Sequence, residues 1–139
     1  MPSSYTAFGP GTVTIGAGTL DFSCEVLGGA VTHEYEDVGE SRTTLCGEQR
    51  PAGKRRSDGL KFSVENDLTA SGLYQFLVTN DLTEQGFVYT PNTADAAKWE
   101  GTVLVTLPAE IGADEFGAPI ASDVEWAGTG GAFTFTAAT

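Results

Sequence analysis

The chain has 139 residues, with 19 acidic and seven basic residues and a formal net charge of −12. This length predicts one domain with its own hydrophobic core. The acidic balance disfavours binding to nucleic acid phosphates over the whole surface, because such binding requires a basic footprint. No secretory leader pattern and no apolar run of membrane-spanning length is found, so we expect a protein that is made in a cytoplasm and stays soluble.

Cysteine and histidine are scarce. The chain contains two cysteines, Cys24 and Cys46, and one histidine, His33. The spacing permits a disulfide, but without a secretory signal we expect two free thiols. These three residues do not supply the ligands of a structural zinc site, which needs four. The sequence therefore predicts no metal and no cofactor.

Basic residues are concentrated in one stretch. Five of the seven lie between Arg42 and Arg56, whereas the acids are spread along the whole chain. One basic patch on an acidic body suits self-association, in which the patch of one copy meets the acidic surface of the next. A solvated charged loop is the simpler alternative.

Most segments alternate with the period of a strand. Residues 1–11 are rich in Pro, Ser and Gly and predict an N-terminal arm, followed by one domain over residues 12–139. Glycines predict turns at Gly28-Gly29, between two strands of a first hairpin, and at residues 128–131. The predicted strands are Thr12–Ile15, Thr19–Leu27, Ala30–Val38, Leu60–Glu65, Gly86–Thr90, Trp99–Leu107, Ile120–Trp126 and the end of the chain from Phe133.

The segment Gly39–Gly59 departs from this alternation. It contains four glycines, Pro51 and the basic cluster, with little apolar content. A structureless connection of this length is uncommon inside a compact domain and is usually functional or disordered. We therefore expect a long loop here that contacts a partner.

One helix is expected at Ser71–Asn80, with Thr69 or Ser71 as its N-cap. Its apolar residues recur at i, i+3 and i+4 and therefore share one face that can lie on a sheet. These residues are Leu73, Phe76 and Leu77. The strands and this helix together predict an all-β fold with one flanking helix, an antiparallel β-sandwich or barrel.

Few groups occur in patterns that support catalysis. Residues 47–54 resemble a phosphate-binding loop, but one residue too many separates the glycines and Arg55 stands where Ser or Thr would bind magnesium. Cys24 would neighbour His33 across the expected first hairpin, where packing is a better interpretation than a nucleophile and its base. We predict that the protein is not an enzyme.

Other polar and aromatic candidates have simple structural interpretations. Neighbouring carboxylates occur as Asp114/Glu115 and Asp123/Glu125. They do not match a calcium loop, and their separation cannot be derived from the sequence, so we interpret them as surface acids. Trp99 and Trp126 are interpreted as core or contact residues rather than sugar platforms.

Five segments in the second half of the sequence are informative through the order in which they follow one another. They are Gly72–Asn80, Phe87–Pro91, Trp99–Val103, Ile111-Gly112 and Asp123–Trp126 with the glycines that follow. In this order they resemble the major tail (tail tube) protein of long, non-contractile-tailed bacteriophages, most closely the type from phages of actinobacteria. The likeness extends from Leu60 to the C-terminus and covers the first half only in pattern.

The resemblance implies a sandwich-like β-barrel with one flanking helix. Six copies would close into a ring, with edge strands as ring contacts, and the rings would stack into a hollow tube for genome delivery. Its partners would be further copies of itself and other phage tail proteins, without a membrane. DNA would pass through transiently without specific binding, because an acidic lumen repels phosphates. The protein would be assembled in the host cytoplasm and located in the virion tail.

The resemblance also implies roles for particular residues. The segment 39–59 lies where the family has an extended loop that reaches the neighbouring ring. We therefore expect contacts with acids of the adjacent ring from Arg50, Lys54, Arg55 and Arg56. Candidate lumen-facing acids, on the outward faces of the expected first hairpin, are Asp21, Glu34 and Glu36. The alternatives are a head-decoration protein, a carbohydrate-binding β-sandwich domain, a small hydrolase that uses His33 and Cys24, or a secretion-system tube protein.

Overall fold

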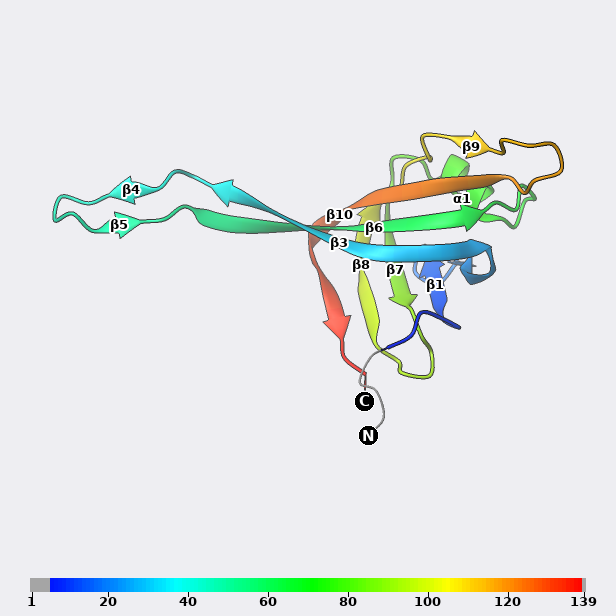
Figure 1. Ribbon diagram of the computed structural model, residues 1–139, viewed down its shortest axis with the longest axis horizontal. Helices are drawn as coiled ribbons and strands as arrows, with labels where there is room; N and C mark the ends of the chain where they lie inside the picture. Colours follow the sequence, from blue (N-terminus) through cyan, green and yellow to red (C-terminus); the bar gives the residue numbers. More distant parts are fainter. Residues whose placement is uncertain (1–5, 139) are drawn as a thin grey trace.

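The computed structural model of the protein describes residues 6–138. These residues form an antiparallel, all-β fold with one short α-helix, as expected (Figure 1). The strands are β1 (Thr12–Ile15), β2 (Leu20–Asp21), β3 (Val26–Val38), β4 (Arg42–Thr43), β5 (Gln49–Arg50), β6 (Gly53–Glu65), β7 (Glu84–Thr90), β8 (Lys98–Leu104), β9 (Ile111–Gly112) and β10 (Ala121–Thr136). The helices are α1 (Leu73–Thr79) and the 3-10 turn η1 (Ser23–Glu25).

One long strand connects the two parts of the main sheet. The strands pair in the order β2-β1-β7-β8-β10-β6-β3, and β9 pairs with the start of β10. The first half of β10 pairs with β6, and its second half pairs with β8 after a shift of register between Thr129 and Thr134. Because β2 and β3 end this order, the described part of the sheet has two open edges.

Apolar side chains from both parts of the sheet and from α1 meet in one core. The ring of Phe62 lies near its centre and meets Phe22, Tyr89 and Trp126 edge-on, with ring centroids 5.2 to 6.2 Å apart. The other core side chains are Val13, Ile15, Leu60, Val64, Leu73, Leu77, Phe87, Val103, Val105, Val124 and Phe133. Removal of such side chains from water is the main force that holds the two parts of the sheet together.

The helix places its apolar face as the periodicity indicates, but it starts later than expected. Leu73 and Leu77 are fully buried, and Phe76 is partly buried against the core. The N-cap is Gly72, and neither Thr69 nor Ser71 caps the helix with its side chain. The predicted N-cap was therefore wrong, because the acceptor for the first backbone N–H of the helix comes from another element. Glu25 in η1 accepts the backbone N–H of Leu73 at 3.0 Å.

The glycine pair Gly28-Gly29 is not a hairpin turn. Both residues lie inside β3, which pairs with β6 with a shift of register between Val26 and Gly28. A Cβ atom at Gly29 would lie 2.3 Å from the ring of Phe62. The pair is therefore required for a close approach between β3 and a core ring, a role that glycine in a strand often has. The expected first hairpin is absent.

Residues 128–131 are likewise part of a strand instead of a turn between two strands. At Gly128, where β10 leaves β6 for β8, a Cβ atom would lie 2.5 Å from the carbonyl oxygen of Asp58 and 2.8 Å from the ring of Phe133. The glycine leaves room for this close contact. One bent strand thus replaces the two strands predicted at Ile120–Trp126 and from Phe133 onward.

The prediction of a structureless loop at Gly39–Gly59 is wrong, because more than half of this segment lies in strands. β3 and β6 have 13 residues each and remain paired far beyond the core, as far as Val38 opposite Gly53. β4 and β5 extend the ribbon further, so that residues 33–58 project from the body as a long arm (Figure 1). Neither face of the ribbon is buried between Gly39 and Ser57, so no apolar alternation marks the strands of this segment in the sequence.

The first residues of the described chain lie against the loop after β7. Gly9 N–H donates to the carbonyl oxygen of Pro91 at 2.6 Å, and Asn92 Nδ2 donates to that of Ala7 at 3.1 Å. The predicted N-terminal arm of residues 1–11 is thus partly attached to the body, and its residues 1–5 lie outside the described part.

We predict that Gly29→Ala destabilises the protein by about 1–3 kcal/mol, because the new methyl group would overpack a core ring. The matched control is Gly28→Ala, since a Cβ atom at Gly28 meets nothing within 4 Å. Urea unfolding of the two variants measures the difference. Equal midpoints would contradict the role given to Gly29.

Candidate functional site

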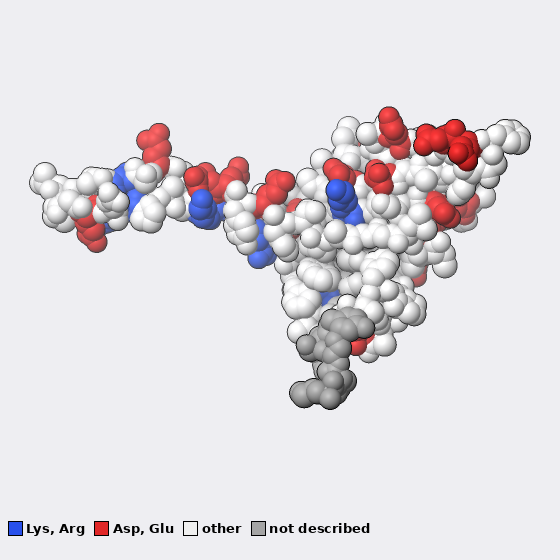
Figure 2. All heavy atoms as spheres, in the orientation of Figure 1, with Lys and Arg blue, Asp and Glu red and all other residues white. Residues whose placement is uncertain are grey.

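The arm of residues 33–58 is the most exposed part of the molecule. All of its residues are exposed except Thr44, Ala52 and Asp58. It carries six acids and five bases, whereas the rest of the chain has thirteen acids and only Lys61 and Lys98 as bases. Figure 2 shows both signs of charge along the arm and acids gathered at the opposite end of the body. A nearly neutral arm therefore projects from a strongly acidic body.

Charged residues near the root of the arm neutralise one another across the ribbon. The register places Glu36 opposite Arg55 and Asp37 opposite Lys54. Arg55 Nε donates to Glu36 Oε1 at 2.7 Å, and Lys54 forms an ion pair with Asp37. Such exposed pairs contribute only about 0.2–1 kcal/mol each, but opposite charges on facing strands favour this register over its neighbours.

A buried carboxylate anchors the arm where it leaves the body. The side chain of Asp58 is fully buried. Its Oδ1 lies 2.6 Å from His33 Nδ1 and 3.1 Å from Arg56 Nε. Its Oδ2 accepts the backbone N–H of Phe133 at 2.8 Å. Because His33 and Arg56 belong to the arm and Phe133 to the second half of β10, this carboxylate ties the arm to the strand that connects the two parts of the sheet.

The surroundings of Asp58 keep it ionised. Burial by itself would raise its pKa, but hydrogen bonds from His33 and from the Phe133 N–H, with the positive charge of Arg56, outweigh burial and lower the pKa. The ionised form accepts hydrogen bonds from His33 and from the Phe133 N–H and forms an ion pair with Arg56. The anchor is therefore fully formed at neutral pH.

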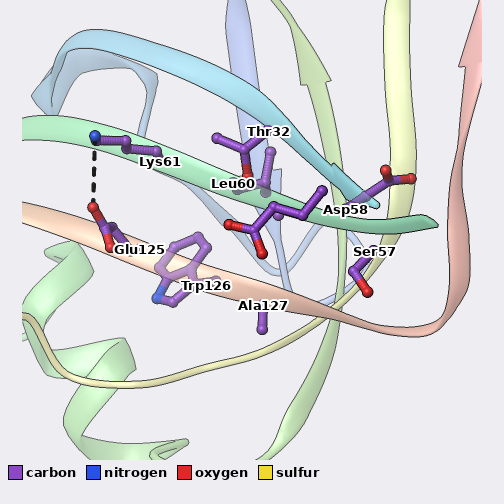
Figure 3. A pocket seen from close by; sticks show the side chains of 10 residues that line it. Thr32, Ser57, Asp58, Leu60, Lys61, Glu125, Trp126 and Ala127 are labelled. Atoms are coloured by element: carbon purple, nitrogen blue, oxygen red, sulfur yellow. Dashed lines mark ion pairs between the residues drawn. The ribbon is translucent and has the colours of Figure 1, made fainter. Parts of the chain in front are cut away.

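A hollow of about 460 Å³ lies beside this anchor, over the root of the arm (Figure 3). Its wall includes Trp126, and Lys61 and Glu125 form an ion pair of 3.6 Å along one side. Glu34 also lines it, whereas both carboxylate oxygens of Asp58 already have partners. The charged groups here thus mostly engage one another.

The four bases expected to contact an adjacent ring all lie on the arm. Lys54, Arg55 and Arg56 already pair with acids of the same arm. Arg50 lies further out, in β5, with Glu48 at 4.0 Å. The four therefore differ in how free they are to bind another molecule.

The three candidate lumen acids do not lie together, because the hairpin that would have grouped them is not formed. Asp21 is in β2, at one edge of the sheet, and accepts the backbone N–H of Ser23 at 3.0 Å. Glu34 and Glu36 are in the arm portion of β3, at the other edge. Asp21 therefore lies apart from Glu34 and Glu36, at the opposite end of the strand order.

The two cysteines are free and exposed. Cys24 lies in η1 and Cys46 at the tip of the arm, and His33 faces Asp58 across the ribbon. The Cys24–His33 pair considered from the sequence depended on a hairpin that is not formed. Sequence reasoning also missed Asp58, because nothing in its local sequence distinguishes it from the other acids.

In residues 6–138 no three His, Cys, Asp or Glu side chains are grouped so as to hold a metal ion. The helices of the same range are all too short or too polar to cross a membrane. A scan of protein-family models and a search of curated proteins find no match to this chain.

We predict that Asp58→Asn lowers the free energy of unfolding by about 1–3 kcal/mol at neutral pH, because the buried site loses its charged acceptor. Since the pKa of Asp58 is lowered in the folded state, its contribution is present above its usual pKa of 3.8 and is lost as pH falls through the lower folded value. The difference between parent and variant should therefore shrink as the pH is reduced to about 2.5.

Urea unfolding across this pH range checks the prediction, with Asp37→Asn as the control. Asp37 is an acid of the same ribbon that is 61% exposed, so its loss should change stability little at any pH. If Asp58→Asn behaves like Asp37→Asn, Asp58 is not the anchor of the arm.

Proposed function

We propose that the protein is a structural virion protein of the tail tube type, whose copies associate into six-membered rings that stack into a hollow conduit for genome delivery. The arm is the observation that carries this proposal. A two-stranded ribbon alone is marginally stable in water, and among residues 6–138 no other strand pairs with this one beyond the body. A second molecule that covers the arm would remove this weakness, and further copies of the same chain are the partners that a tube provides.

The open edges of the sheet support the same function. β3 at one end and β2 at the other leave backbone groups free for pairing with another chain. In the proposed ring, edge-to-edge pairing joins the sheets of six sandwich-like barrels, and closed symmetry ends the association. Other phage tail proteins would bind at the ends of the tube.

The charge of the body fits a conduit that does not hold DNA. Outside the arm, thirteen acids face only two bases. An acidic surface repels the phosphate backbone, so a duplex passes without specific binding, whereas a basic surface would retain it.

The alternatives gain less support from the side chains. A sugar platform needs exposed aromatic faces, but Trp126 is 2% exposed and its Nε1 donates to the carbonyl oxygen of Thr106. Trp99 is partly buried and stacks on Tyr89. A head-decoration protein would also use an arm, but on a preformed capsid lattice. Self-assembly of the purified chain separates these two possibilities.

We predict that removal of the arm abolishes assembly and leaves the fold intact. In the variant, residues 36–55 are replaced by Asn-Gly, a two-residue hairpin turn that keeps Tyr35 opposite Arg56 and His33 opposite Asp58. The parent should form six-fold rings or hollow tubes by negative-stain electron microscopy, and the variant should remain a folded monomer by circular dichroism and solution mass.

A charge exchange on the body serves as the control, with Lys61→Glu and Glu125→Lys exchanged between the facing strands β6 and β10. It retains the arm and its net charge and should assemble like the parent. Tubes of normal length from the arm-deleted variant, or a parent that stays monomeric at all concentrations, would contradict the proposed function.

A further inference from the structure

An apolar pocket of about 300 Å³ lies between β1 and the start of β3. Val13 and Val26 contribute one side chain from each of these strands, and the N-terminal segment and the loop after β7 add Phe8, Pro10 and Pro91. None of the described residues that line this pocket is charged. Carboxylates, by contrast, line both the hollow at the arm root and a groove of about 1020 Å³ beside the segment 109–119.

The pocket wall also contains a polar group that lacks a partner. Tyr89 lines the pocket and is only 5% exposed, with its ring edge-on to Phe62 and stacked on Trp99. Its hydroxyl forms no hydrogen bond within residues 6–138, although a buried phenol usually has one. Burial raises the pKa of Tyr89, so the hydroxyl stays protonated and free to donate. The pocket therefore suits an apolar group that brings a hydrogen-bond acceptor with it.

A fully exposed aromatic side chain lies elsewhere on the body. Phe116 belongs to the loop between β9 and β10, which projects from the end of the body opposite the arm (Figure 1). The loop turns tightly here, because Ala118 N–H donates to the carbonyl oxygen of Glu115 at 3.2 Å. An aromatic ring on an ordered turn is well suited to anchor a contact, since its burial is favourable and little order is lost on binding.

Charge limits where this turn can bind on another copy. Asp114 and Glu115 precede Phe116, so acidic surfaces repel the turn, and both the hollow at the arm root and the groove are acidic. The apolar pocket adds no such repulsion, and its volume accommodates a phenyl ring, since an apolar cavity of about 150 Å³ already holds benzene. We propose that Phe116 of one copy inserts into the apolar pocket of a second copy, where the hydroxyl of Tyr89 donates to an oxygen of the incoming turn.

This contact rests on the proposed self-assembly and names a pair of surfaces through which neighbouring copies bind. It is heterologous, because the turn of one copy meets the pocket of the next. Each copy offers one turn and one pocket, so a closed ring fills every pocket, whereas a dimer joined by one such contact leaves one pocket empty. The contact therefore favours ring closure over small open assemblies.

Cross-linking between two differently tagged variants tests the contact directly. The first variant carries Cys46→Ser and retains Cys24, an exposed thiol that lines the pocket. The second has both cysteines replaced by serine and carries Ala118→Cys, an exposed position two residues after Phe116. Mixed under assembly conditions with a short bismaleimide, they should form a linked species with one copy of each. Thr134→Cys, exposed on the second half of β10, replaces Ala118→Cys in the matched control and should give no mixed species.

Replacement of the anchor tests its contribution to assembly. Phe116→Ala should raise the critical concentration for assembly about 10- to 100-fold, because a buried phenyl group is lost from the contact. The monomer should stay folded by circular dichroism, since the side chain is fully exposed. Leu68→Ala removes another exposed apolar side chain, 59% exposed, and should assemble like the parent.

The outcomes separate this contact from the proposed function. A mixed cross-linked species together with a raised critical concentration for Phe116→Ala establishes the contact. Parent tubes without the mixed species, or Phe116→Ala that assembles at the parent's concentration, would overturn the contact and leave the tube. A small apolar molecule retained in the pocket of assembled protein, detected by native mass spectrometry, would also overturn it. A parent that never assembles would overturn both.

Discussion

The direction of the arm depends on one buried carboxylate. A buried charge is costly unless hydrogen bonds and opposite charge compensate it, and Asp58 obtains both from His33, Arg56 and the Phe133 N–H. These donors lie on three different strands that meet where the ribbon leaves the core. Gly128 leaves room for β10 to bend at the same point. Loss of any donor would leave the carboxylate partly unsatisfied, so the arm is held in one position relative to the sheet.

Beyond this anchor antiparallel backbone pairing holds the ribbon together, and facing charges near its root favour its register. Ion pairs near the root leave little net charge there, and the tip, residues 39–52, has two acids, Glu40 and Glu48, for its two arginines. The arm is therefore a nearly neutral ribbon whose side chains are almost all exposed.

The parts of the fold that the sequence predicts are those with one buried face. The strand Thr12–Ile15 and the apolar face of α1 follow hydrophobic periodicity, which reports burial. Between Gly39 and Ser57 the arm has no buried face, so its strands there are not detected by this signal. The role of Gly28-Gly29 is ambiguous in the sequence, because glycine occurs both in turns and where backbone approaches a side chain closely. The close packing of Phe62 against Gly29 in the structure shows that the second role applies. The anchor could not be predicted, because Asp58 finds its partners 25 and 75 residues away.

Hydrogen–deuterium exchange of the full chain, compared between dilute and assembled protein, tests most directly whether the arm is an assembly element. In the dilute protein the amides of the tip should exchange rapidly, because a free two-stranded ribbon opens readily. On assembly the amides of the arm should gain protection, while the core strands change little. Unchanged exchange in the arm of the assembled protein would show that the arm contacts no neighbour and would contradict the central claim.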